Sequence, residues 1–505
     1  MGFLTAPLLI AFAFAALAAG PLRFLIRRRV RRLMDDGAGS GAAIAARAER
    51  DDVPPLQLDT SAPADEPEGD AARALFARML RARRRAAMSY LVAGLMAACV
   101  LAVADAAAES RPFTFAERVG LLLNHMGAVL LTVAAIVVPS FRVRLLFLLS
   151  AFVVLTYLTA FLNGVELSFG RSGLTPALFF LLVGNRWLKT IALVAALMVL
   201  VPVCSIFLLA LALDAENGLF LRAGLLLLFG AVAFFLLAPA YERKLFSDVS
   251  VELTFLWIVF LVFWVMLRRD DGVVWAAVAA FLLYEAFVYT GLLTVRREAR
   301  AHRAVSLLVL RAFGTPSRSH NLFDRLGTRW RYAGPIHLIA GTDSAIANLD
   351  PAEAVRCLTL RIPSLFVRSQ ADLARRLPPD RDPDPDGRYR VNDFFCSAGM
   401  WRTTFESLLE HSDVVLVDLA GYGPSNAGVT YELGQLLARK PLDSFVLITD
   451  RATDREHLEL TLQRLWRQAG ASAERPVVRI LHEPKAHALV AALCDAVTQP
   501  VQSPA

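Results

Sequence analysis

Two carboxylates flank a glycine-rich turn in the C-terminal part of this 505-residue chain. An apolar run ends at Asp418, the turn follows, and a helical pattern then opens around Glu432. A strand that ends at Asp418 would place this carboxylate at the carboxyl edge of a sheet, with Glu432 in the first turns of the next helix. Both carboxylates could then face one cleft. There a carboxylate can stabilise or trap an oxocarbenium-like centre, as it does in glycoside hydrolysis.

The turn between these carboxylates is suited to an anionic ligand. Gly421, Gly423 and Gly428 would let the backbone approach a ligand closely, because glycine has no Cβ. The N-terminus of the following helix carries a partial positive charge, which favours an anion. Asn426 and Tyr431 belong to the same stretch and are further candidates for ligand binding.

The order of a strand ending in Asp, a Gly/Asn turn and a Tyr-Glu-Leu-Gly helix resembles the nucleoside 2-deoxyribosyltransferase-like fold, which is related in layout to TIR domains. The resemblance is closest over residues 413–440, and the order of strands and helices extends it loosely over residues 304–499. It implies that Glu432 is the catalytic carboxylate at the anomeric carbon, with Asp418 and Asn426 near the sugar. NAD, a nucleotide or a nucleoside would be the ligand or substrate, and no other cofactor and no metal is expected.

Other predicted strand ends offer groups that a nucleotide needs. Arg311 and Phe313 end one apolar run, and Gly341 and Asp343 end the next. Arginines suit phosphate groups, and carboxylates suit ribose hydroxyls. In the alternative interpretation these residues cap strand ends and pair on the surface, and Glu432 is simply a carboxylate at a helix start.

The elements that would position these residues are short apolar runs alternating with amphipathic helices. Candidate strands cover residues 306–313, 335–340, 413–419, 444–449 and 477–481. Candidate helices cover residues 322–333, 400–410, 429–439, 455–469 and 485–497. Continuous apolar strands separated by helices predict a doubly wound α/β domain with a parallel sheet of about five strands. Such sheets bind ligands at the carboxyl ends of their strands.

Residues 351–395 interrupt this pattern and are expected to be irregular. The stretch from Asp382 to Gly387 matches the start of a calcium loop, with Asp393 at the twelfth position. However, prolines stiffen the stretch, no strong helix follows it, and the last ligand would be Asp instead of Glu. A solvated turn is therefore favoured over a metal loop.

The first three-fifths of the chain has the composition of a membrane protein. The whole chain is 56% hydrophobic and 20% charged, against ~45–50% and ~25% in soluble proteins, and the excess lies before residue 295. A helix needs about 20 apolar residues to cross a bilayer. An α-helical transmembrane bundle of eight spans is predicted at residues 3–22, 90–108, 119–138, 145–162, 191–213, 223–240, 251–267 and 273–295.

A ninth, shorter apolar segment at residues 176–184 decides the orientation. Eight spans with an outside N-terminus would leave the C-terminus outside, whereas the basic residues at 296–303 favour the cytoplasm. If the short segment crosses as part of a broken helix, the C-terminal domain is cytoplasmic. Otherwise the segment lies in the membrane interface. We expect a multi-pass protein of the cell (inner) membrane with a cytoplasmic C-terminal domain.

The chain is thus expected to divide into a first transmembrane helix (1–26), a basic and disordered cytoplasmic linker (27–88), a transmembrane bundle (89–295) and a cytoplasmic α/β domain (304–499). The linker assignment depends on residues 35–75, which are rich in Gly, Ala, Ser, Pro and acids without apolar periodicity. Within the bundle, Glu285 is central to its span. It is either a hydrogen-bonded carboxyl between helices or an ion or ligand site.

Three functions fit this organisation. The favoured one is a membrane-tethered sensor or effector whose α/β domain binds a nucleotide-like ligand. The alternatives are an N-glycosidase or deoxyribosyl transferase acting on NAD or nucleosides, and a non-catalytic scaffold. The net charge of +7 does not indicate nucleic-acid binding, because the arginine clusters stand beside apolar runs. The expected partners are the lipid bilayer and a nucleotide-like small molecule, and self-association into a homo-oligomer stays open.

Overall fold

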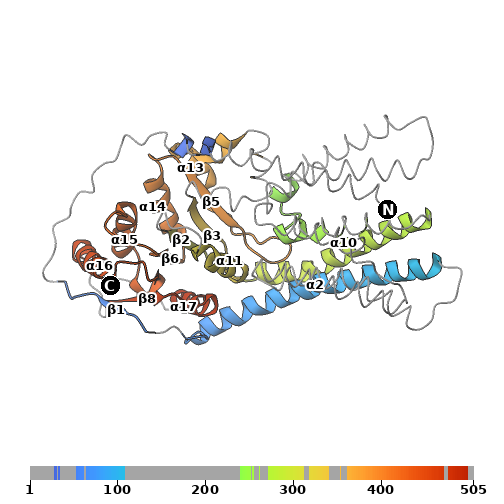
Figure 1. Cartoon of the computed structure of the whole chain (residues 1–505), viewed down its shortest axis with the longest axis horizontal. Helices are drawn as coiled ribbons and strands as arrows, with labels where there is room; N and C mark the ends of the chain where they lie inside the picture. Colours follow the sequence, from blue (N-terminus) through green and yellow to red (C-terminus); the bar gives the residue numbers. More distant parts are fainter. Residues whose placement is uncertain are drawn as a thin grey trace, which may run out of the picture.

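The centre of the molecule is a sheet of eight strands (Figure 1). The computed structural model describes residues 28–30, 32–34, 53–61, 64–108, 239–251, 271–311, 318–340, 361–470 and 476–498, with the single residues 253, 254, 257, 261, 353 and 356. The strands, in their order across the sheet, are β1 (Gln57–Asp59), β8 (Val477–His482), β7 (Phe445–Thr449), β6 (Val414–Asp418), β2 (Leu307–Arg311), β3 (Ile336–Ala340), β5 (Val391–Cys396) and β4 (Phe366–Val367). All neighbouring strands are parallel, so the predicted parallel sheet is confirmed.

Helices cover both faces of this sheet. The helices of the sheet domain are α11 (Arg318–Trp330), α13 (Gln370–Arg376), α14 (Trp401–His411), α15 (Ala427–Arg439), α16 (Arg455–Ala469) and α17 (Ala486–Thr498). Val309 and Leu416 belong to the apolar cluster that contains α11 and α17. Leu308 and Val417 belong to the cluster of α14, α15 and α16. Successive side chains of a strand point to opposite faces, and both faces are buried, so the predicted α/β arrangement is also confirmed.

Two strands lie in the region that was expected to be irregular. β5 pairs with β3 along its length, and β4 pairs with the end of β5. The expectation was wrong because Asn392 and Asp393 interrupt the apolar residues of β5, which is fully buried only from Phe394, so it lacks the continuous apolar run of the central strands. β4 has only two residues, which is too short to give a pattern.

The prediction of a disordered linker is wrong for β1 and the residues around it. The backbone N–H of Leu56 donates to the Gln463 side chain at 3.0 Å, and Gln463 donates back to the Leu56 carbonyl at 2.6 Å. The Trp466 indole donates to the Pro54 carbonyl at 2.9 Å. This edge strand is therefore held by backbone pairing with β8 and by side chains of α16. Three residues held in this way need no apolar periodicity of their own.

Two long helices extend away from the sheet domain. They are α2 (Asp70–Ala108) and α10 (Asp271–Arg300), which lie side by side and project in the same direction (Figure 1). Phe76 and Met79 of α2 belong to the apolar cluster that also contains Leu489 and Leu493 of α17. A fragment that began at residue 304 would lack β1 and this part of α2, and would expose apolar surface of α17.

Two helices in the described part of the chain are long and apolar enough to cross a membrane, Asp70–Ala104 and Trp275–Arg300. They contain the predicted spans at residues 90–108 and 273–295, almost to their ends. The eight-span bundle is not supported by this finding. The predicted spans 3–22, 119–138, 145–162, 191–213, 223–240 and 251–267 and the short segment 176–184 lie wholly or mostly outside the described residues. α2 continues without a break through the predicted boundary between linker and bundle at residue 88.

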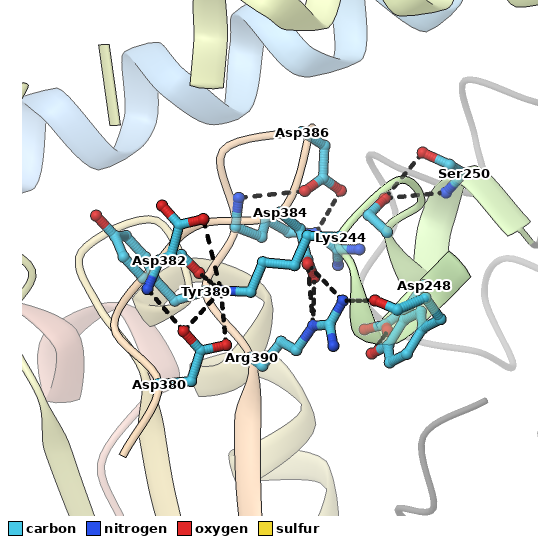
Figure 2. Close-up of polar contacts among 12 residues, drawn as sticks. Lys244, Asp248, Ser250, Asp380, Asp382, Asp384, Asp386, Tyr389 and Arg390 are labelled. Atoms are coloured by element: carbon cyan, nitrogen blue, oxygen red, sulfur yellow. Dashed lines mark hydrogen bonds and ion pairs between the residues drawn. The ribbon is translucent and has the colours of Figure 1, made fainter. Parts of the chain in front are cut away.

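Ion pairs join the loop 380–390, which leads into β5, to residues 239–251 (Figure 2). A further ion pair joins this loop to the end of α10. We call these contacts the joint. The Arg300 guanidinium donates to both carboxylate oxygens of Asp382, at 2.9 and 2.8 Å. The Tyr389 hydroxyl donates to a backbone carbonyl of α10 at 3.1 Å. These hydrogen bonds therefore attach the loop to the end of α10.

The segment 239–251 adds its own contacts to the joint. The buried ammonium of Lys244 lies 2.6 Å from a carboxylate oxygen of Asp380 (Figure 2). Asp248 accepts a hydrogen bond from the Tyr241 hydroxyl and pairs with Arg331, each at 2.6 Å. Because Arg331 follows α11 directly, this segment is fixed to the sheet domain at two places.

Two aspartates of the loop are buried inside the joint. Asp384 is 0% exposed and pairs with Arg390 at 2.8 Å, and Asp386 is 1% exposed and pairs with Arg388 at 2.8 Å. The expectation of a solvated turn is wrong here, because these carboxylates face arginines from their own chain segment. Within the described residues, no group of three or more His, Cys, Asp or Glu side chains could hold a metal ion.

Candidate functional site

Arg311 and Asp418 are neighbours at the carboxyl edge of the sheet. They occupy paired positions on β2 and β6. By the alternation of strand side chains, both point to the face of Val309 and Leu416, which is covered by α11 and α17. The Arg311 guanidinium accordingly lies 4.7 Å from the ring centre of Phe323 of α11. An arginine and a carboxylate are thus brought together on one face, as the sequence suggested.

The turn after β6 is held by a residue that the sequence reasoning missed. The Asp450 carboxylate accepts hydrogen bonds from the backbone N–H groups of Gly421 and Ala452 and from the Thr453 hydroxyl, all at 3.0 Å. Burial alone would raise the pKa of Asp450, but these hydrogen bonds outweigh it and lower the pKa. Asp450 directly follows a correctly predicted strand, and this position at the carboxyl edge was the signal that could have identified it.

Further contacts order the glycine-rich turn. Gly421 has φ +68, a left-handed conformation that glycine adopts without strain. The Asn426 side-chain oxygen accepts from the backbone N–H of Gly423 at 2.9 Å. The hydroxyls of Tyr422 and Thr430 are 2.8 Å apart. Asn426 therefore closes the turn and makes no side-chain cap on α15.

Tyr431 faces α14. Its hydroxyl donates to the Glu406 carboxylate, and its ring meets the rings of Trp401 and Phe405 edge-on, with centres 5.6 and 6.3 Å apart. Burial, together with the hydrogen bond to Glu406, raises the pKa of Tyr431 to about 12. These contacts show that the Tyr431 side chain packs between α14 and α15.

Glu432 lies inside the apolar contact of α15 with the sheet. Its side chain is 3% exposed, and among the described residues its Oε2 atom has no hydrogen-bond partner. Val429, Leu433 and Leu436 on the same helix are part of the surrounding apolar cluster. Burial raises the pKa of Glu432 to about 8, so the carboxyl group carries its proton at pH 7. It can donate a hydrogen bond or a proton there.

Glu432 and Asp418 do not share one face of the sheet. α15 packs on the face of Val415 and Val417, whereas Asp418 shares the face of Leu416. The expectation that both carboxylates face one cleft is therefore wrong. The reason is the two-residue period of a strand, which turns Asp418 away from the helix that follows it.

The remaining predicted residues, Phe313, Gly341 and Asp343, lie outside the described residues, as do the segments that follow β2 and β3 at this edge. The described part of the site thus consists of the Arg311–Asp418 neighbours, the turn held by Asp450, and the buried Glu432.

Comparisons with known proteins add no relative to this picture. No family model, no curated protein and no solved structure matches the chain.

Proposed function

We propose that this protein is a membrane-tethered sensor or effector whose α/β domain binds a nucleotide-like ligand at the carboxyl edge of its sheet. The observation that carries the proposal is Glu432, a buried carboxyl group without a polar partner among the described residues. Burying a polar group without a hydrogen bond costs free energy, and such groups occur disproportionately at functional sites. The N-terminus of α15, which follows the turn held by Asp450 and has no side-chain cap, would offer backbone N–H groups to the same ligand.

The membrane part of the proposal depends on α2 and α10. Both are apolar over a membrane-spanning length, and both reach the sheet domain as unbroken helices. The basic end of α10, with Arg296 and Arg300, would lie on the cytoplasmic side by the positive-inside rule. We infer an inner-membrane protein with lipid as a partner and a cytoplasmic C-terminal domain.

The binding proposal is tested on the full-length chain in detergent, titrated with AMP, ATP, NAD and adenosine. A ligand at about 100 times its Kd should stabilise the fold by ~2.7 kcal/mol, seen as a rise of several degrees in the melting temperature. Asp450→Ala should weaken binding about ten-fold, because it releases the turn. Asp443→Ala, at an exposed position before the start of β7 and away from the carboxyl edge, is the matched control and should bind like the wild type. Folded protein that responds to none of these ligands would favour the scaffold.

The raised pKa of Glu432 also favours a second function, N-glycoside cleavage of NAD or a nucleoside. A carboxyl group that keeps its proton at neutral pH can act as a general acid toward the purine that leaves a nucleoside, while water adds at the anomeric carbon. Nicotinamide leaves NAD as a neutral molecule, so its departure does not use this proton. Asp418 is not its partner in this scheme, since it lies on the other face. The full-length protein should then release adenine from adenosine, and Glu432→Gln should abolish release while the exposed control Glu459→Gln retains it. Release that persists in Glu432→Gln would rule out this role.

A further inference from the structure

A cavity of about 560 Å³ opens beside the first four residues of β5, away from the carboxyl edge of the central strands. β4 pairs only with Phe395 and Cys396 of β5. Residues 391–394 of β5 therefore face the cavity on the side away from β3, where they pair with no strand of the described chain. The other walls come from residues 363–366 and from α13. The volume lies within the ~300–1,000 Å³ of small-molecule sites.

The strand edge presents backbone polar groups to this cavity. The Arg390 carbonyl accepts from the N–H of Ile336, so it points to β3. In a parallel ladder, consecutive residues direct their backbone groups to alternate sides. The N–H and carbonyl of Val391 therefore point to the cavity side of β5, where Val391 is one of the lining residues.

Arg376 is a cationic group of the cavity wall whose guanidinium has no ion pair in the described part of the chain. It is half-buried, and in the described part of the chain its guanidinium makes one hydrogen bond, to the Ser364 carbonyl at 3.1 Å. Burial lowers the pKa of Arg376, and the charges of Glu353 and Asp372, which act in the opposite direction, do not outweigh it. A guanidinium has five N–H donors, so most of its donor capacity is available to an anion.

The other charged residues of the cavity define the ligand further. Arg375 is already paired with Asp372, whereas the exposed Arg368 stands at the same cavity without an ion pair in the described structure. Carboxylates from Glu353 and Asp393 also line it. Arginines bind phosphate, and carboxylates accept hydrogen bonds from hydroxyl groups. A phosphate group alone would be attracted by the arginines but repelled by the carboxylates. A phosphorylated polyol would bind the arginines through its phosphate and the carboxylates through its hydroxyl groups.

The cavity also adjoins the joint. Asp380, which lines the cavity, pairs with Lys244, and Arg356, also in its lining, pairs with Glu242. An occupant would therefore touch the loop that is fixed to the segment 239–251. We propose that this cavity binds a phosphate ester of a polyhydroxylated molecule, with Arg376 and Arg368 holding the phosphate. This site is separate from the one at the carboxyl edge.

The test uses the full-length protein in detergent with glycerol 3-phosphate as a soluble probe, and nanodiscs of phosphatidylglycerol or phosphatidylcholine as lipid probes. Wild-type protein should bind glycerol 3-phosphate, or gain thermal stability in phosphatidylglycerol over phosphatidylcholine. The first result identifies a soluble source of the ligand and the second a lipid headgroup. Binding to neither probe would overturn the proposal.

Arg376→Gln should weaken whichever response is seen by about ten-fold or more, because it removes a charged hydrogen-bond donor. Arg368→Gln changes an exposed residue and should weaken the same response. This variant keeps the proposal testable if Arg376→Gln fails to fold. Arg451→Gln is the matched control, since Arg451 is exposed and pairs with Glu483 away from the cavity. Equal binding by wild type and Arg368→Gln and Arg376→Gln, or equal loss in Arg451→Gln, would overturn the assignment. Asp450→Ala should leave this response unchanged, which separates it from the carboxyl-edge site.

Discussion

Glu432→Gln is expected to leave the stability of the protein nearly unchanged at pH 5 and to increase it by several kcal/mol at pH 8. Burial raises the pKa of Glu432 from its ordinary 4.5 to about 8 in the folded state. Between these pH values the unfolded chain loses the proton and the folded chain keeps it, so the unfolded state is favoured as pH rises. The glutamine side chain of the variant has no proton to lose and escapes this penalty.

The size of this effect follows from the pKa. Each pH unit between 4.5 and 8 costs the wild type ~1.4 kcal/mol, so the difference approaches ~5 kcal/mol at most. The measurement is the melting temperature of both proteins in detergent from pH 5 to pH 8.5, followed by tryptophan fluorescence. Glu459→Gln, on the exposed side of α16, should follow the wild type at every pH. If the difference in melting temperature between Glu432→Gln and wild type stayed constant with pH, folding would not raise the pKa of Glu432.

Arg390→Met is expected to destabilise the protein by about 3–5 kcal/mol, because it leaves a buried carboxylate without its cation. The Arg390 guanidinium bonds to the fully buried Asp384 and lies 3.8 Å from the ring centre of Tyr241. Burial already raises the pKa of Asp384 to about 6, against the attraction of Arg390. Without Arg390 the carboxyl group would take up a proton more readily. The loss should therefore be smaller at pH 5 than at pH 8.

A double variant and a surface variant serve as controls. Adding Asp384→Asn to Arg390→Met should recover part of the lost stability, because no charge is then left unpaired. Arg300→Met removes a pair that is half exposed on both sides and should cost less than ~1 kcal/mol. Chemical denaturation in detergent at both pH values measures these three variants, Asp384→Asn alone and the wild type. A double variant that loses the sum of both single effects would contradict the pairing.

Regular elements with a strong local pattern could be predicted from the sequence. β6 and β7 each consist of four apolar residues followed by one polar residue, all of them buried. α16 (Arg455–Ala469) has the predicted bounds, with an Asp454 cap at its start. These elements placed Asp418 at the carboxyl edge and Glu432 in the following helix. Each of these features depends on residues close together in the chain, so a single sequence contains the information.

Features that depend on distant partners could not be predicted in this way. β1 is a strand because residues about 400 positions later complete its hydrogen bonds; Leu56 and Gln463 are 407 residues apart. The stretch around Asp384 and Asp386 has the composition of a solvated turn, but both carboxylates are buried and pair with arginines at the joint. The raised pKa of Glu432 likewise results from apolar groups of several elements around it.

By itself the sequence thus determined an apolar first three-fifths of the chain, a parallel α/β domain and the strand–turn–helix unit between Asp418 and Glu432. Only the tertiary structure decided that these two carboxylates lie on opposite faces, that β1 and α2 belong to the sheet domain, and that a cavity borders β5. The physical reason is that hydrophobic periodicity acts over a few residues, whereas burial and pairing depend on which segments meet in the folded chain.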